Sequence, residues 1–133
     1  MKILCSICAR GGSTSLKNKN IKILNGKPLI IHTLITAKKT KIFDKIVVSS
    51  DSKNILKISK RYANYLIKRP FKLSHDKAPK IPAIKHALLS SENFFDKKFD
   101  IIIDLDATSP LRQVKDITKA LKKFLKNKNS NLF

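Results

Sequence analysis

Short apolar runs alternate along the chain with longer stretches in which apolar residues recur every three or four positions. The short runs predict strands at residues 2–8, 45–49, 65–68 and 100–105. The first run is almost continuously apolar, which is typical of a parallel strand that is buried on both faces. The pattern therefore predicts a central sheet rather than a helical bundle.

The longer stretches predict one helix after each strand. The first helix follows Asn25-Gly26-Lys27, with Pro28 in its first turn and its body over residues 29–37. Either Asp51 or Ser52 can cap the second helix. The apolar faces of the last three helices are formed by Ile55, Ile58 and Tyr62, by Ile81, Ile84 and Leu88, and by Val114, Ile117, Leu121, Phe124 and Leu125.

The order βαβαβαβα predicts a three-layer α/β/α fold with a mostly parallel, Rossmann-like sheet, right-handed crossovers and helices on both faces. A chain of 133 residues is sufficient for one domain. Residues 130–133 have the composition of an opening strand. We therefore expect residues 1–133 to be the N-terminal part of a single larger domain, truncated after the fourth βα unit.

A net charge of +20 raises the alternative of a basic nucleic-acid-binding module. Only four of the 29 cationic residues are Arg, which base and phosphate readers favour, and aromatic residues do not interleave with the basic ones. We interpret most lysines as a solvated surface. No apolar run reaches the roughly 18 residues of a membrane helix, and no export cleavage pattern follows residues 1–8, so we expect a soluble, cytoplasmic protein without a membrane partner.

Cys5 and Cys8 form a CxxC pair inside the first predicted strand. Residues three apart on a strand point to opposite faces, so the two sulfur atoms cannot share a zinc ion or a disulfide. We interpret both as buried structural cysteines.

Ligands of open parallel sheets bind beyond the carboxyl ends of the strands, so the four loops that leave the strands are the candidate site. Three of the four arginines, Arg10, Arg69 and Arg112, lie in these loops. In the first loop, Gly11 and Gly12 allow the backbone to form a concave anion site. An ordinary βα loop is the alternative, since neither GxGxxG nor a Walker motif is present.

Four motifs follow one another at these strand ends: ARGGS with KNKN, then SSDS, then RPFKLSHDKAP, then DATSPLR. In this order they resemble the acylneuraminate cytidylyltransferases, or CMP-sialic acid synthetases, including those for legionaminic and pseudaminic acid. The resemblance covers nearly the whole chain. It implies a nucleotidyltransferase that uses Mg²⁺ to transfer CMP from CTP to a nine-carbon 2-keto sugar acid, with release of pyrophosphate.

The resemblance also implies roles for individual residues. Nucleotide binding is implied for Ala9, Arg10, Gly11, Gly12, Ser13, Lys19, Asn20, Arg69, Asp76 and Asp106. The implied catalytic cations are Arg10 and Lys19. Contact with the sugar acid is implied for Thr108, Ser109 and Arg112.

Two positions depart from the family pattern. Thr14 occupies the place of a motif lysine, which removes one phosphate-binding cation. Asp106 stands where many members have Gln. Its carboxylate suits Mg²⁺, and Asp104, two residues earlier on the same predicted strand, would face the same way. The alternative is that one of the two caps the next turn and the other is a solvated charge.

In the family, the remaining metal ligands, much of the sugar site and the dimerisation segment lie in a second half that is absent here. The resemblance thus implies a homodimer for the full-length form. An inactive fragment or pseudoenzyme of the same fold remains an alternative, and we expect the 133-residue chain alone to bind CTP weakly and to turn over little.

Overall fold

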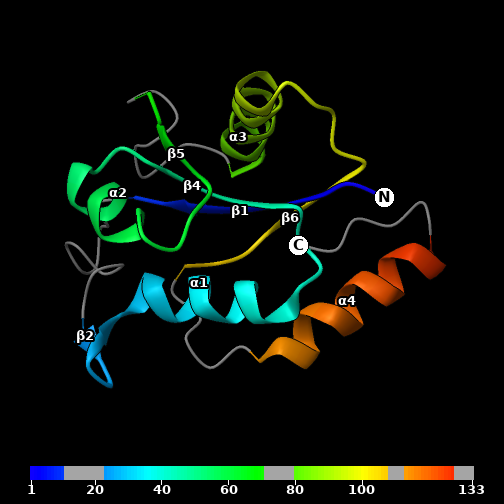
Figure 1. Ribbon diagram of the computed structural model, residues 1–133, viewed down its shortest axis with the longest axis horizontal. Helices are drawn as coiled ribbons and strands as arrows, with labels where there is room; N and C mark the ends of the chain where they lie inside the picture. Colours follow the sequence, from blue (N-terminus) through cyan, green and yellow to red (C-terminus); the bar gives the residue numbers. More distant parts are fainter. Residues whose placement is uncertain (11–22, 71–79, 108–112, 128–133) are drawn as a thin grey trace.

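The computed structural model describes residues 1–10, 23–70, 80–107 and 113–127. Four parallel strands form its main sheet in the order β5-β4-β1-β6 (Figure 1). These strands are β1 (Ile3–Ala9), β4 (Lys45–Ser50), β5 (Tyr65–Lys68) and β6 (Ile101–Asp104). The four predicted strands are confirmed, with bounds that shift by at most one residue.

Helices cover both faces of this sheet, as Figure 1 shows. One face carries α1 (Leu29–Thr40), α2 (Lys53–Ser59) and α4 (Val114–Lys126), and the other carries α3 (Lys80–Phe95). The three-layer α/β/α prediction is therefore confirmed. Ser52 caps α2 by accepting a hydrogen bond from the Ile55 amide at 3.3 Å, which decides between the two predicted caps.

Strand alternation divides the apolar core in two. Cys5 and Ile7 of β1 belong to the cluster beneath α1, α2 and α4, whereas Leu4 and Cys8 belong to the cluster beneath α3. The two cysteines are free thiols on opposite faces, as predicted, but only Cys5 is fully buried and Cys8 is half-buried. Among the described residues no group of three His, Cys, Asp or Glu side chains could hold a metal ion.

A short antiparallel hairpin precedes α1 and was missed by the sequence pattern. Strands β2 (Ile23–Leu24) and β3 (Lys27–Pro28) pair across Asn25 and Gly26, whose φ angles are 49° and 80°. Positive φ at both central residues is the geometry of a type I′ turn, for which Asn-Gly is the preferred sequence. The turn signal was present, but the flanking strands are too short to show an apolar alternation.

Three predicted helix faces need correction. On α4, Leu125 is 39% exposed, and Ile117 is the residue of the predicted face that is buried. Ile81 is 57% exposed, and α3 instead packs on the sheet through Ala83, Ile84, Ala87 and Ser91. The small side chains allow a close approach to the sheet, and a search for large apolar residues overlooks them. Tyr62 lies beyond the end of α2 at Ser59, although it still packs against the core.

The amino ends of the strands are capped by polar side chains from distant segments. The Ile3 amide donates to Asp44 Oδ2 at 2.6 Å, and the Lys2 amide donates to Asp100 Oδ2 at 2.6 Å. The Ile46 amide donates to Asn64 Oδ1 at 2.8 Å. This edge is thereby closed, and the carboxyl ends of the strands form the opposite edge. Within the described ranges, no helix is both long and apolar enough to cross a bilayer.

Candidate active site

Arg69 connects the carboxyl ends of three strands. It follows β5, and its amide donates to the Ser50 carbonyl oxygen at 2.9 Å, continuing the pairing with β4. Its Nη2 atom donates to the carbonyl oxygen of Ala9, the last residue of β1, at 3.1 Å. With only 4% of its surface exposed, Arg69 is fixed against the end of β1.

Arg10 and Arg69 lie close enough to affect each other electrostatically. Burial lowers the pKa of Arg69, and the positive charge of Arg10 lowers that pKa further, whereas Cys8, Asp51 and Asp104 act in the opposite direction. A guanidinium remains charged at neutral pH because its ordinary pKa is so high. Two cations held together at a strand-end edge attract an anionic ligand.

The face of the sheet beneath α3 changes from apolar to polar toward this same edge. Leu4 and Val47 are apolar and fully buried, and the next positions on that face are Ser6, Cys8 and Ser49. Burial raises the pKa of the Cys8 thiol to about 12, and the neighbouring Asp104 carboxylate contributes to the increase. Cys8 is therefore a neutral thiol at physiological pH and is not a nucleophile.

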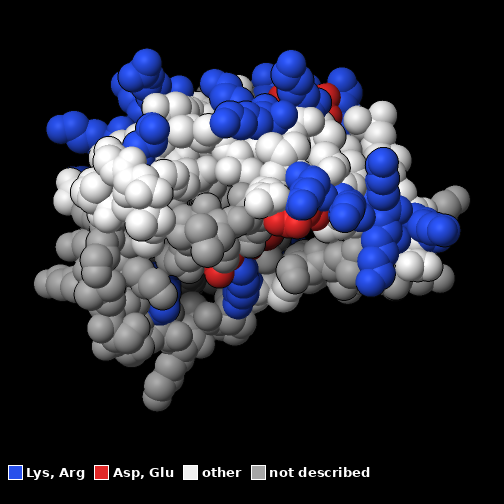
Figure 2. Space-filling model, turned by 90° about the horizontal axis from the view of Figure 1, so that it is seen from below, with Lys and Arg blue, Asp and Glu red and all other residues white. Residues whose placement is uncertain are grey.

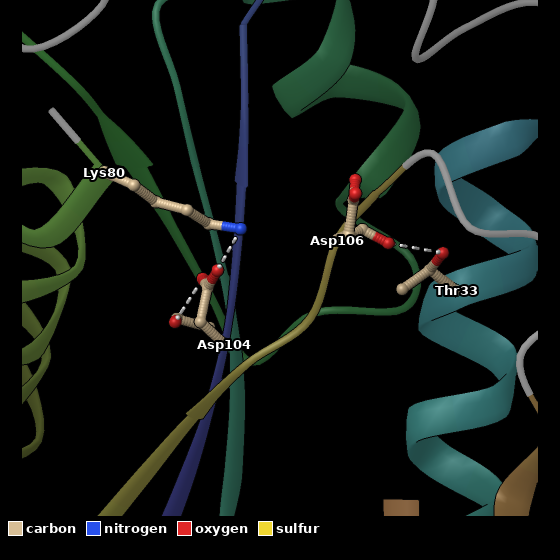
Figure 3. Close-up of polar contacts among 5 residues, drawn as sticks. Thr33, Lys80, Asp104 and Asp106 are labelled. Atoms are coloured by element: carbon tan, nitrogen blue, oxygen red, sulfur yellow. Dashed lines mark hydrogen bonds and ion pairs between the residues drawn. The ribbon is translucent and has the colours of Figure 1, made fainter. Parts of the chain in front are cut away.

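A buried carboxylate lies in the centre of this polar region. Asp104 ends β6 and is 8% exposed. The Ser6 hydroxyl donates to its Oδ1 atom at 2.8 Å, and Lys80 Nζ forms an ion pair with its Oδ2 atom at 3.2 Å (Figure 3). Lys80 is the first residue of α3, so this contact joins the start of that helix to the end of β6.

Asp106 has different surroundings from Asp104. Strand β6 ends at Asp104, so the two-residue alternation on which we based a shared orientation does not extend to Asp106, and that part of the prediction is wrong. Asp106 is exposed, and its carbonyl oxygen and that of Ala107 accept from Thr33 Oγ1 at 3.4 and 3.3 Å (Figure 3). A helix α1 side chain thus holds the segment that carries the Asp106 carboxylate.

Four of the predicted site residues lie in the described part of the chain, and two of the pairings among them are visible there. Arg69 contacts Ala9 directly and lies near Arg10, whereas Asp106 follows the neighbouring strand. The others lie outside the described residues: Gly11, Gly12, Ser13, Lys19, Asn20, Asp76, Thr108, Ser109 and Arg112.

The sequence reasoning missed Lys80, and it considered Asp104 only as a partner of Asp106. A carboxylate at the end of the apolar run IIID signals a buried charge that needs a partner. No local pattern identifies that partner, because Lys80 and Asp104 are brought together only by the packing of α3 on the sheet.

The sheet is open and parallel, and its strand order changes direction beside β1. Cations lie at the carboxyl ends of its strands. These features define a class of α/β proteins that bind anionic ligands such as nucleotides at that edge. The chain belongs to the cytidylyltransferase family, whose profile matches residues 4–132.

Relatives with assigned names are similar over most of this chain. It is 48% identical over 132 residues to the post-translational flagellin modification protein B of Campylobacter coli, covering 98% of this chain and 56% of that protein. It is 46% identical over 110 residues to the CMP-N,N′-diacetyllegionaminic acid synthase of Campylobacter jejuni, covering 82% of this chain and 47% of that protein. The chain therefore spans about half the length of these curated relatives.

Solved structures share the fold. A CMP:2-keto-3-deoxy-manno-octonic acid synthetase complexed with CTP matches with a TM-score of 0.75 at 20% identity, covering 97% of this chain and 49% of that one. A 4-diphosphocytidyl-2C-methyl-D-erythritol synthase matches with a TM-score of 0.69 at 12% identity, covering 92% and 54%. The α/β fold predicted from the sequence is that of nucleotidyltransferases.

Proposed function

We propose that this protein, in its full-length form, is a cytidylyltransferase that transfers CMP from CTP to a nonulosonic acid and releases pyrophosphate. The observation that carries the proposal is the buried Arg69 guanidinium, which reaches from the end of β5 to the end of β1 beside Arg10. Family membership supports CTP as the donor, and the names of the relatives for legionaminic and pseudaminic acid support the acceptor class.

In the proposed reaction, the anomeric hydroxyl oxygen of the sugar attacks the α-phosphorus of CTP. The new P–O bond forms as the bond from the α-phosphorus to the pyrophosphate oxygen breaks, pyrophosphate leaves with that electron pair, and the hydroxyl proton passes to solvent. Arg10 and Arg69 would offset the negative charge that increases on the phosphate oxygens. Fixed alignment of the reactants contributes on the order of 7 kcal/mol, and a guanidinium held by a backbone carbonyl suits that task.

The remaining site assignments belong to the same proposal. Gly11, Gly12 and Ser13 would surround the phosphates, and Lys19 would assist Arg10 in catalysis. Asn20 and Asp76 would bind the nucleotide, and the sugar acid would contact Thr108, Ser109 and Arg112.

Mg²⁺ would supply Lewis-acid polarisation of the phosphates when bound. A magnesium ion usually keeps several waters and takes one or two carboxylates together with substrate phosphate oxygens. An exposed carboxylate just beyond β6, with its backbone held by Thr33, fits the protein's share of that ligand set. Asp106 is therefore the residue proposed to hold the ion.

The test of the proposed function is selectivity for CTP. Millimolar CTP with Mg²⁺ should raise the thermal unfolding midpoint of the 133-residue chain by several degrees more than ATP, UTP or GTP does, because a ligand that binds only the folded state stabilises it. Equal shifts with all four nucleotides would contradict the proposal.

Turnover is the second measurement. The full-length form should release pyrophosphate from CTP only in the presence of legionaminic or pseudaminic acid. The same proposal places this form in the cytoplasm as a homodimer. The 133-residue chain should give at most slow release, because it spans about half of its relatives. A full-length protein that binds CTP without turnover would instead indicate a pseudoenzyme.

A further inference from the structure

We propose that Lys80 and Asp104 form a positioning pair for the nucleotide site. The carboxylate at the end of β6 holds the ammonium group of the first residue of α3, and the pair thereby fixes the start of α3 relative to β1. Neither residue needs to touch the ligand. The choice of CTP as the ligand rests on the proposed function, whereas the pair itself is a feature of the fold.

The pair lies at one end of the connection between β5 and α3. Arg69 is anchored to Ala9 at the end of β1, and Lys80 is anchored to Asp104 on the strand next to β1. These two anchors stand at the two ends of one connection, between β5 and α3. That connection includes the predicted site residue Asp76. Both ends of the connection are thus fixed to the pair of strands beside the candidate site.

The two oxygen atoms of the Asp104 carboxylate contact different elements. The Ser6 hydroxyl on β1 donates to Oδ1 at 2.8 Å, so the orientation of the Asp104 carboxylate is set before Lys80 is considered. The Oδ2 atom is then directed toward the Lys80 ammonium at 3.2 Å (Figure 3). One carboxylate oxygen is thus bound to the sheet and the other to the helix. The carboxylate can therefore fix the position of the helix relative to the sheet.

The ion pair is not explained by a gain in folding stability alone. The Asp104 side chain is 1% exposed, whereas the Lys80 side chain is 56% exposed. Desolvation of a carboxylate is costly, and a buried ion pair is often no more stabilising than well-packed apolar groups of similar volume. Asp104 follows three isoleucines on β6, a strand in which another apolar residue would have been the simple choice. A carboxylate at this position, held by Ser6 and Lys80, fits a role in orientation.

The pair interacts electrostatically with Cys8 and with Arg69. Asp104 and Lys80 both act on Cys8, and Asp104 also acts on Arg69. The pair therefore belongs to the same charged region as the guanidinium that carries the proposed function. Displacement of Lys80 from Asp104 would change both the start of α3 and the field around Arg69.

The experiment is a double-mutant cycle read by CTP affinity. The proteins are the unaltered chain, Asp104→Asn, Lys80→Met and the double variant, each titrated with CTP and Mg²⁺ by calorimetry and by thermal unfolding. Each single change should weaken CTP binding about fivefold or more, and the double variant should bind no more weakly than the weaker single variant, because the interaction is lost only once. Lys80→Arg should restore most of the affinity.

The matched control is Lys85→Met, which removes one positive charge from an exposed position of the same helix. It should leave CTP affinity within about twofold of the unaltered chain, because Lys85 is exposed to solvent and salt screens the interactions of exposed charges. Asp104→Asn should also unfold at an unchanged or slightly higher temperature, since Lys80 can turn to solvent. Loss of affinity without loss of stability is the signature that a merely structural role would not produce.

Three results would overturn the positioning pair: equal losses of affinity in Lys80→Met and Lys85→Met, losses that multiply in the double variant, or single variants that bind CTP normally. An unaltered chain that does not bind CTP would contradict the proposed function instead. In that case the unfolding midpoints of the four proteins test the interaction between Lys80 and Asp104. Shifts of the midpoint that are not additive in the double variant support the interaction, and additive shifts contradict it.

Discussion

At the scale of the residue, Arg69 shows how a single side chain can organise a site. Its planar guanidinium is almost completely buried and is held by the Ala9 carbonyl oxygen. Burying a cation is costly unless its donors are satisfied, and Arg offers several donors in a fixed geometry. A planar guanidinium also suits an oxygen-rich ligand such as a phosphate group, because it can donate two parallel hydrogen bonds.

We expect Arg69→Lys to weaken CTP binding by about tenfold, because an ammonium group on a flexible stem cannot donate to the Ala9 carbonyl and to a phosphate in the same planar arrangement. Calorimetric titration with CTP measures the change. Arg61→Lys is the matched control, since Arg61 is exposed and lies over the Tyr62 ring. Equal affinity in Arg69→Lys and in the unaltered chain would contradict the assigned role.

At the scale of the element, the two edges of the sheet are used differently. Side chains cap the amino ends of the strands, where Asp44 and Asp100 accept hydrogen bonds from the backbone of the first strand and its lead-in. The carboxyl edge instead gathers Arg10, Arg69 and Lys80. One edge is thus closed by capping side chains, whereas the other carries cations beside the carboxylates of Asp104 and Asp106.

Asp44 makes a pH-dependent contribution to strand β1. The hydrogen bond from the Ile3 amide lowers the pKa of its carboxyl below the ordinary value of 3.8. A lowered folded-state pKa stabilises the fold above the unfolded-state pKa, and this stabilisation is lost as the pH falls through the folded-state value. Asp44→Asn should therefore unfold at a lower temperature than the unaltered chain at pH 7, with a smaller difference at pH 3.

Thermal unfolding followed by circular dichroism at both pH values measures that difference. Since Asn keeps an acceptor oxygen for the Ile3 amide, the comparison isolates the charge of the carboxylate. A deficit of the same size at pH 3 and at pH 7 would show that the ionised form has no special role.

At the scale of the whole molecule, the charge of +20 results from 29 Lys and Arg residues set against only nine Asp and Glu residues. Several of the nine acidic residues make structural contacts: Asp44 and Asp100 cap strands, Glu92 accepts from the Phe99 amide, and Asp116 belongs to the capping box of α4. Figure 2 shows Lys and Arg side chains along the upper border and at the right-hand end of the face seen from below, with Asp or Glu side chains and further Lys or Arg side chains near its centre.

We expect salt to separate the two kinds of anion binding. Any binding of a random DNA duplex should fall steeply between about 50 and 200 mM salt, because it would depend on counterion release at exposed lysines. The selective stabilisation by CTP should persist, since the buried Arg69 is screened less. Mobility shifts and thermal unfolding at the two salt concentrations test this. Persistent duplex binding at 200 mM salt, with loss of the CTP effect, would favour the nucleic-acid module.

Much of the fold could be predicted from local patterns. Apolar runs located β1, β4, β5 and β6, and helical spacing located the four helices, because burial of one element face repeats every two or every three to four residues. The failures have physical causes. The β2–β3 hairpin is too short for a period to appear, and Ala83 and Ala87 pack α3 closely without being large.

The sequence by itself determined the four strands of the main sheet and the four helices, and it placed Arg10, Arg69 and Asp106 after strands that end at one edge. Only the tertiary structure decided which side chains meet. The Arg69–Ala9 contact joins residues 60 positions apart, and the Ser6–Asp104 contact joins residues 98 apart. Such pairs depend on the strand order β5-β4-β1-β6 and on the side of the sheet that α3 covers. Local periodicity fixes which residues are buried, whereas contacts between buried polar groups are selected by the packing of elements that are distant along the chain.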